Sequence, residues 1–289
     1  MKNKTTNQIM EAIAGSLEIP PSAYEKAESR YNNLGEWLED KKSASSEYSP
    51  HIYSQGSFRL GTVIRPVDSS ESYDLDLGCR LQSGVSKQTH TQEQLKKLIG
   101  VDLEAYRRAN GIQHELEEKH RCWRLDYLDE LNFHIDVVPS IPEDETQIAS
   151  LQGAMTSQGF VDTLANTVAS HAGSITDNRH PSYRSISGDW RISNSEGYAL
   201  WFESRLKQAE QLLKRRALEA SVATVEDLPA WRWKTPLQQS IQILKRHRDI
   251  MYKDDPDGKP ISIILTTLAA SAYQGEDILE DALERILTD

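Results

Sequence analysis

A chain of 289 residues can bury a core of its own, and 38% hydrophobic with 27% charged residues excludes wholesale disorder. The formal net charge of −11, from 33 basic and 44 acidic side chains, argues against a broad nucleic-acid surface and confines any such surface to a local patch. The two cysteines, Cys79 and Cys122, form no CxxC pair, so neither a disulfide framework nor a cysteine zinc site is predicted.

The N-terminal part of the chain predicts helix followed by a short strand. Residues 7–43 have helical apolar spacing, which Pro20-Pro21 is expected to break. Residues 51–55 form a short predicted strand, and Gly56-Ser57 ends it in a turn. We therefore expect the chain to change direction at this glycine.

Two later segments combine strand periodicity with acidic residues. Residues 73–77 alternate apolar and acidic residues, so Asp74 and Asp76 are expected to point to the same side of a strand. Residues 131–138 alternate in the same way and carry Asp136 on the polar face. Between these segments the sequence predicts a polar loop at 82–92, a helix at 93–110, a strand at 121–127 and a connection at 128–130.

The rest of the chain is predicted to be mixed and then helical. Residues 140–189 show few periodic cues and are expected to form a crossover with some helix. Three helix starts follow: a capping box at residues 193–196 before a helix at 198–219, a cap at Thr235 before a helix reaching about 252, and Pro260 as the first residue of a third helix.

This order of elements predicts an α+β protein with two domains. Residues 1–190 would form an N-terminal helix plus a mixed-sheet core, and residues 191–289 would form a C-terminal helical domain packed against it. A cleft between the two is the expected ligand site.

The acidic strands predict metal chemistry. Nucleotidyl transfer must neutralise triphosphate charge and stabilise departing pyrophosphate, which two divalent ions roughly 3.5–4 Å apart can do. Asp74, Asp76 and Asp136 would supply the hard oxygen ligands that such ions require. Taken alone, an Asp-x-Asp pair most often lies on a solvated loop, although the apolar flanks Tyr73, Leu75 and Leu77 favour the metal site here. Asp136 alone could be a polar residue near a strand end.

Gly56-Ser57 is a candidate phosphate holder. Glycine lets backbone N–H groups approach an anion, and the serine hydroxyl adds a donor. A bare Gly-Ser pair otherwise indicates only a turn. The ordered set of Gly56-Ser57, Asp74-x-Asp76 and Asp136 distinguishes the two interpretations.

Together these residues resemble the signature of the polymerase β-like nucleotidyltransferase superfamily. Five longer segments are similar to the bacterial cGAS/DncV-like nucleotidyltransferases: GSFRLGT, SYDLDLG, FHIDVVPS, ISNSEGYALWF and TPLQQSIQILKRHRD. The resemblance covers roughly residues 50–275. It implies a polymerase β-like core and an enzyme that joins ribonucleoside triphosphates into cyclic di- or trinucleotide messengers of anti-phage defence.

The resemblance also implies roles for individual residues. Asp74, Asp76 and Asp136 match the catalytic metal ligands, and the remaining matches are the nucleotide-contacting positions Gln55, Gly56, Ser57, Asn194, Lys245 and Ser262. From the residues alone, Lys245 can equally lie on a solvated basic helix face, whereas Ser262 is expected near the free N–H groups of a helix start. His134 is a candidate neighbour of the metal ligands.

The implied cofactor is a pair of Mg²⁺ ions, with Mn²⁺ as an alternative. The implied partners are ATP, GTP or a pyrimidine nucleoside triphosphate, together with a regulatory protein. We expect a cytoplasmic protein, because residues 1–10 lack an apolar signal core and the longest apolar run, 261–272, is shorter than the roughly 20 residues of a membrane span.

Two alternative functions stay open from the sequence. The acceptor could be an RNA end, a protein or a small molecule, or the chain could be a catalytically silent nucleotide-binding module. The chain ends at Asp289, whereas members of the resembled family often carry more helix, so a short form and a trimmed chain both stay open.

Overall fold

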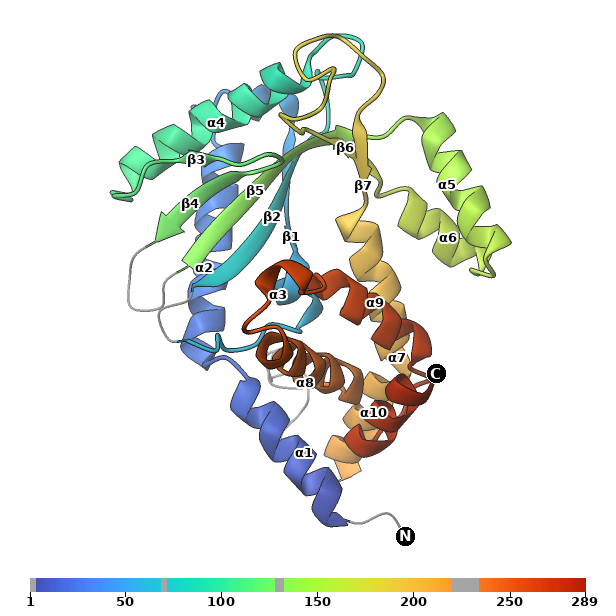
Figure 1. Cartoon of the computed structure of the whole chain (residues 1–289). Helices are drawn as coiled ribbons and strands as arrows, with labels where there is room; N and C mark the ends of the chain where they lie inside the picture. Colours follow the sequence, from blue (N-terminus) through green and yellow to red (C-terminus); the bar gives the residue numbers. More distant parts are fainter. Residues whose placement is uncertain (1–3, 69–71, 128–132, 220–233) are drawn as a thin grey trace. The chain divides into compact units, whose positions relative to one another are not determined.

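The computed structural model describes residues 4–68, 72–127, 133–219 and 234–289 (Figure 1). The helices are α1 (Lys4–Leu17), α2 (Pro21–Glu39), η1 (Ser46–Tyr48), α3 (Gly56–Leu60), α4 (Gln92–Ala109), α5 (Glu145–Ser157), α6 (Asp162–Ala169), α7 (Ser195–Glu219), α8 (Pro236–Met251), η4 (Pro256–Gly258), α9 (Ser262–Ala272) and α10 (Leu279–Thr288). The strands are β1 (Pro50–Gln55), β2 (Tyr73–Leu81), β3 (Glu117–Glu118), β4 (Trp123–Tyr127), β5 (Phe133–Pro142), β6 (Gly173–Ile175) and β7 (Arg191–Ser193).

The chain divides into two compact units, each assembled from separate stretches of sequence. The sheet unit comprises Glu25–Phe58 and Ser70–Trp201. The helical unit comprises Met1–Tyr24, Arg59–Ser69 and Phe202–Asp289. The chain passes from the first unit to the second for the last time inside α7. The sequence-based boundary at 190/191 stays a prediction.

The sheet unit is built on a mixed sheet with a parallel pair at its centre. The strand order is β1-β2-β5-β4-β3, and β6 continues from β5 to β7. Strand β2 runs parallel to β5, whereas β1 and β4 are antiparallel to their neighbours (Figure 1). The predicted mixed α/β core is confirmed, including both acidic strands. The predicted connection at 128–130 lies outside the described residues.

The hydrophobic core of the sheet unit lies on one face of the sheet. Every second residue of the central strands is buried there, and the set comprises Leu75, Leu77, Leu125, Phe133, Ile135 and Val137. Helix α4 packs against β4 and β5, and buried Leu95, Ile99 and Leu103 belong to it. Because side chains alternate along a strand, the polar residues between these core positions share the opposite face.

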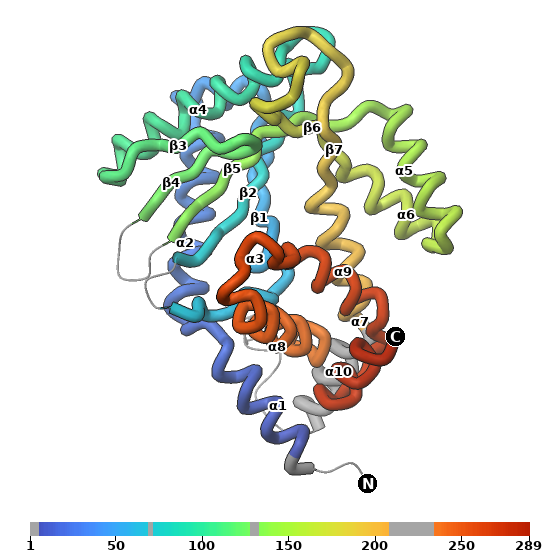
Figure 2. Tube along the Cα trace, viewed as in Figure 1, coloured from blue at the N-terminus to red at the C-terminus, as the bar shows by residue number. Residues whose placement is uncertain are grey.

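The helical unit brings the two ends of the sequence together. Helix α1 packs against α8 and α10, and Ala14, Leu279 and Leu283 form a buried cluster (Figure 2). The side chain of Asn7 also accepts a hydrogen bond from the Glu280 N–H at the start of α10, at 3.1 Å. The predicted break of the N-terminal helix at Pro20-Pro21 is confirmed, because α1 ends at Leu17 and α2 begins at Pro21.

The helix starts were predicted with mixed success. Thr235 caps α8 with a capping box, as predicted. The capping box predicted at residues 193–196 is wrong. Asn194 caps α7 instead, because its side chain accepts the hydrogen bond from Gly197 N, at 3.0 Å. Helix α9 begins at Ser262 and not at Pro260, which lies before the cap.

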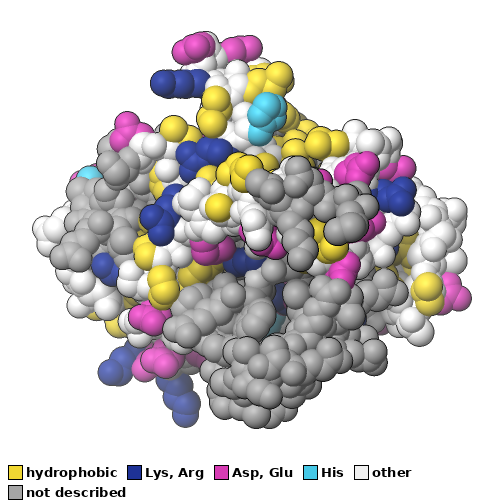
Figure 3. Space-filling model, turned by 90° about the horizontal axis from the view of Figure 1, so that it is seen from below, with side chains coloured by type: hydrophobic (Ala, Val, Ile, Leu, Met, Phe, Trp, Pro, Cys, Tyr) yellow, Lys and Arg dark blue, Asp and Glu magenta, His cyan; other side chains and the backbone are white. Residues whose placement is uncertain are grey.

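The surface of the described residues carries both signs of charge. Acidic and basic side chains are interspersed among apolar ones on the face shown in Figure 3. Among the described helices, none combines the length and apolarity that a membrane crossing demands.

Candidate functional site: an acidic face on the central strands

The parallel pairing of β2 and β5 brings the three predicted carboxylates onto one face. In the register of these strands Asp76 lies opposite Asp136, and Asp74 lies opposite His134. The residues between them, including Leu75 and Ile135, are buried on the other face. The predicted trio is therefore assembled by the pairing of two strands that lie about sixty residues apart in the sequence.

Strand register extends this arrangement into two rows. The first row joins Gln55, Asp76, Asp136 and Arg124. The second row joins Asp74, His134 and Asp126. We call Asp74, Asp76, Asp136, Arg124, Asp126 and His134 the acidic face. It combines four carboxylates with one guanidinium and one imidazole.

Arg124 holds Asp136 in a two-point ion pair. Its Nε lies 2.7 Å from Oδ1 of Asp136 and its Nη2 lies 2.7 Å from Oδ2. Nη2 also lies 3.7 Å from Oδ1 of Asp74. The Asp136 side chain is only 17% exposed, so solvent screens this pair weakly. The hydrogen bond and charge of Asp136 raise the pKa of Arg124, which is charged at any physiological pH.

The pKa values of Cys122 and Asp74, beside and on this face, are both raised. Burial, followed by the charge of Asp136 and a hydrogen bond to it, raises the pKa of the Cys122 thiol to about 12. Desolvation by the surrounding protein raises the pKa of Asp74 although its side chain is largely exposed; Asp136 and Asp126 add to this effect, and Arg124 and His134 oppose it. Desolvation, more than repulsion between like charges, thus disfavours ionisation of Asp74.

His134 and Asp126 form a second pair on the acidic face. Nδ1 of His134 contacts Oδ1 of Asp126 on the adjacent strand. A carboxylate at one ring nitrogen fixes the orientation of the imidazole. The sequence identified His134 as a neighbour of the predicted ligands, and the register confirms that position.

Gly56 lies directly against Asp76. It begins α3 with a φ of +65°, in the left-handed region that glycine adopts without strain. A Cβ at this position would lie 2.1 Å from Oδ2 of Asp76. Gly56-Ser57 thus opens a short helix rather than a simple turn. The neighbouring Gln55 donates from Nε2 to the Leu77 carbonyl at 3.3 Å, across the β1–β2 pair.

Asn194 has a structural role at the start of α7. Its Oδ1 accepts a hydrogen bond from Gly197 N at 3.0 Å, and its Nδ2 donates to the Val168 carbonyl at 2.7 Å. Both ends of the amide therefore have backbone partners. The predicted contact to a nucleotide base stays a prediction.

Lys245 and Ser262 belong to the helical unit, and each has a defined partner there. Lys245 is 4% exposed and donates from Nζ to the Thr62 carbonyl, at 2.9 Å, so it does not lie on a solvated basic face. Ser262 is the first residue of α9 and accepts a hydrogen bond from Nη1 of Arg248 at 2.9 Å. Their contacts to a triphosphate stay predictions.

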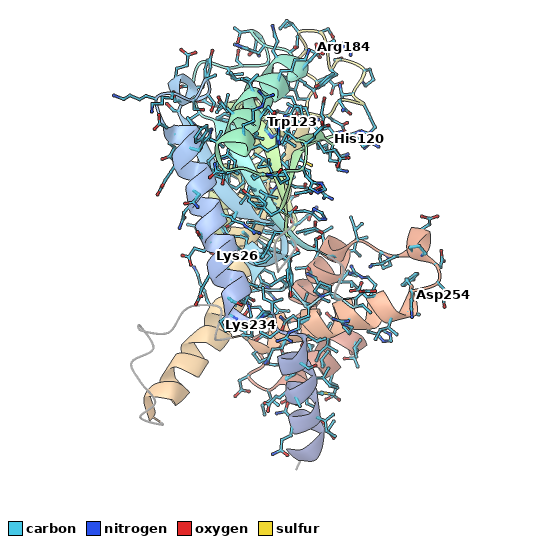
Figure 4. All side chains as sticks on the ribbon, turned by 90° about the vertical axis from the view of Figure 1, so that its left-hand side faces the viewer. Lys26, His120, Trp123, Arg184, Lys234 and Asp254 are labelled. Atoms are coloured by element: carbon cyan, nitrogen blue, oxygen red, sulfur yellow. The ribbon has the colours of Figure 1, made fainter. Side chains whose placement is uncertain are left out.

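Sequence reasoning missed Arg124 and Asp126. The signal was available, because residues 123–127 alternate apolar or aromatic residues with charged ones, and Arg124 and Asp126 occupy the charged positions. Trp123 fixes this alternation: its Nε1 donates to the Lys96 carbonyl at 2.8 Å, beside α4 (Figure 4). What the sequence lacked was the register that places Arg124 opposite Asp136.

The donor chemistry of the acidic face suits a hard divalent cation. Carboxylate oxygens are the ligands that Mg²⁺ and Mn²⁺ prefer, and Asp74, Asp76 and Asp136 provide them from two neighbouring strands. As the side chains stand, however, no three His, Cys, Asp or Glu residues within the described part of the chain are placed to hold a metal ion. Asp136 instead pairs with Arg124, which also approaches Asp74.

Comparisons with known proteins find similarity over the part of the chain that contains these residues. Residues 50–139, which contain Gly56 and the three carboxylates, match the nucleotidyltransferase domain of the cyclic GMP-AMP synthase DncV-like family. A c-di-GMP synthase of Roseivirga ehrenbergii is 28% identical over 282 residues, which are 96% of this chain and 63% of that protein. The chain thus spans less than two thirds of this relative's length.

Solved structures share the fold. The CD-NTase CdnG of Bradyrhizobium diazoefficiens, solved in complex with GTP, aligns with a TM-score of 0.68 at 21% identity, over 97% of this chain and 74% of that one. The CdnC:HORMA-deltaN complex of Escherichia coli aligns with a TM-score of 0.58 at 12% identity, over 95% of this chain and 68% of that one. Residues 50–139 are thus similar to the nucleotidyltransferase domain of the DncV-like cyclic GMP-AMP synthases, and the chain shares the fold of the solved CD-NTase CdnG.

Proposed function

We propose that this protein is a metal-dependent nucleotidyltransferase that joins ribonucleoside triphosphates into a cyclic oligonucleotide. The observation that carries the proposal is the acidic face, where two parallel strands set Asp74, Asp76 and Asp136 together and Gly56 lies against Asp76. The complete set of three carboxylates favours a catalytic, metal-binding role over a silent nucleotide-binding module, even though Arg124 offsets part of their mutual repulsion.

In this proposal Asp74, Asp76 and Asp136 hold two divalent ions, Mg²⁺ or Mn²⁺. Bound there, the ions supply charge neutralisation for the triphosphate and lower the pKa of an attacking hydroxyl. The fixed strand register holds the carboxylates at set spacings, which is what orienting a reaction centre requires.

The residues around the carboxylates would bind the nucleotide. Gly56 lets its backbone lie directly against the Asp76 carboxylate, and the Ser57 backbone and hydroxyl offer donors to a phosphate group. Gln55 precedes them on β1. Lys245 and Ser262 in the helical unit are the proposed contacts to the triphosphate, and Asn194 is the proposed contact to a base.

The cyclic product is proposed from the relatives. The relative from Roseivirga is named a c-di-GMP synthase, and the CdnG structure contains GTP. We therefore propose GTP as a substrate, with ATP and pyrimidine nucleotides as further candidates. Because CdnC was solved with a HORMA protein, we include a regulatory protein partner in the proposal. A role in anti-phage signalling and a cytoplasmic location follow from the same family proposal.

The test is to incubate the protein with each labelled nucleoside triphosphate, and with all four together, in Mg²⁺ or Mn²⁺. We expect a product that resists phosphatase, with one pyrophosphate released for each nucleotide incorporated. A linear product would release less pyrophosphate and would lose its terminal phosphates to the phosphatase. Failure to form any product across all nucleotides, both metals and added candidate partner proteins would refute the proposal.

A further inference from the structure

Arg124 is held on the acidic face because Trp123, the preceding residue of β4, is fixed against α4 on the other face of the sheet. The preceding Trp123 donates to the Lys96 carbonyl at 2.8 Å and packs so closely on α4 that a Cβ on Gly100 would lie 2.5 Å from its ring. This contact anchors the start of β4 to the helix. Because side chains alternate along a strand, Arg124 must then face the carboxylates.

The ion pair occupies both oxygens of Asp136. The guanidinium contacts Oδ1 and Oδ2 at 2.7 Å each, a two-point geometry that is among the strongest hydrogen-bonded pairings in proteins. Its Nη2 also approaches Asp74, at 3.7 Å. One fixed positive charge thus serves two of the three proposed metal ligands.

A divalent ion would compete with this guanidinium. An ion bound to Asp136 needs an oxygen that already accepts a charge-assisted hydrogen bond, and it would lie within a few ångströms of a group of the same sign. Partly buried charges of like sign at that separation repel strongly, because solvent screens them poorly.

We propose that Arg124 is an internal counter-cation of the acidic face: it neutralises Asp136 and Asp74 before metal binds, and it must release Asp136 when a divalent ion binds. This inference rests on the proposed function, since it assigns the same carboxylates to the metal. Arg124 is then a positioning residue that holds the Asp136 carboxylate in place. It also makes the apparent metal affinity depend on the fraction of molecules in which the pair is open.

Three variants test the competition. Arg124→Gln removes the charge and the two-point pairing, whereas Arg124→Lys keeps the charge and loses the pairing geometry. Arg121→Gln is the matched control: it removes the same charge from a residue that pairs with Asp177, at 3.0 Å, instead of with Asp136. Comparison of the three separates the local ion pair from the net charge of the protein.

The primary measurement is calorimetric titration of metal-stripped protein with Mn²⁺ and with Mg²⁺, with and without a non-hydrolysable nucleoside triphosphate. If the paired state outnumbers the open state by about ten to one, Arg124→Gln should bind metal about tenfold more tightly than wild type. Arg124→Lys should bind severalfold more tightly, and Arg121→Gln should match wild type. Equal or weaker binding by both Arg124 variants would overturn the inference.

A second measurement reports on the arginine itself. The Nε–H resonance of Arg124, assigned by its loss in Arg124→Lys, should shift when Mg²⁺ is added to the wild-type protein. An unchanged resonance at saturating metal would contradict the release of Asp136. Metal binding by wild type with no difference among variants refutes only the counter-cation, whereas no metal binding even with nucleotide refutes the proposed function.

Discussion

Replacement of Gly56 by alanine tests whether the close contact between this residue and Asp76 matters for chemistry. The new Cβ would lie 2.1 Å from Oδ2 of Asp76 and 2.9 Å from its Cγ. To reach ordinary van der Waals contact the carboxylate must retreat by about 1.3 Å. Misplacement of a reacting group by about 1 Å can reduce turnover about a hundredfold. We therefore expect Gly56→Ala to lose nucleotidyl transfer by about two orders of magnitude.

The effect on folding should be small by comparison. At a φ of +65° an alanine costs about 1–2 kcal/mol of backbone strain. Gly111→Ala is the matched control, because Gly111 has the same φ of +65° and a Cβ there meets nothing within 4 Å. Turnover is measured as pyrophosphate release, and stability by urea unfolding. The reasoning is refuted if Gly56→Ala keeps near-normal turnover, or if Gly111→Ala loses as much.

Two further predictions concern buried charges. The Asp177 carboxylate is fully buried; desolvation opposes its ionisation, but bonds from Arg121 and from the Arg179 N–H lower its pKa to about 2. Ionised Asp177 should therefore contribute roughly 2 kcal/mol to the free energy of unfolding above the ordinary Asp pKa. This contribution should be lost as the pH falls from about 4 to about 2, and the free energy of unfolding of Asp177→Asn should show no such loss over that range. Lys245→Met leaves the Thr62 carbonyl without its 2.9 Å donor, so urea unfolding should show a loss of about 1–3 kcal/mol. If Lys245 also contacts the triphosphate, KM should rise; an unchanged KM would contradict that contact.

The local pattern predicted the acidic strands well. Alternation of apolar and acidic residues around Asp74 and Asp76 required a half-buried strand, and the same pattern around Asp136 required another. Their positions on one face followed once β2 and β5 paired in parallel. That pairing is a contact between distant segments, so the sequence could identify the residues but not their register.

The same limit explains what was missed. Arg124 was visible as a strand residue, but its partner depended on which residue of β5 it would oppose. For Lys245 the sequence left a solvated basic face and a triphosphate contact equally open, yet the side chain is buried and bonds to Thr62, which lies far away in the sequence. At residues 193–196 the motif for a capping box was present, but Glu196 pairs with Arg80, at 3.0 Å, and Asn194 caps the helix instead.

The most direct test of the central claim is Asp76→Asn in the labelled-nucleotide assay. The change keeps the shape of the side chain and removes the charge that the proposed metal site needs. Asp189→Asn, at a carboxylate that is 82% exposed, is the control for loss of one negative charge. Our account predicts that Asp76→Asn lowers nucleotidyl transfer at least about a hundredfold with an unchanged unfolding transition, and that the control matches wild type. Near-normal nucleotidyl transfer by folded Asp76→Asn would contradict the account.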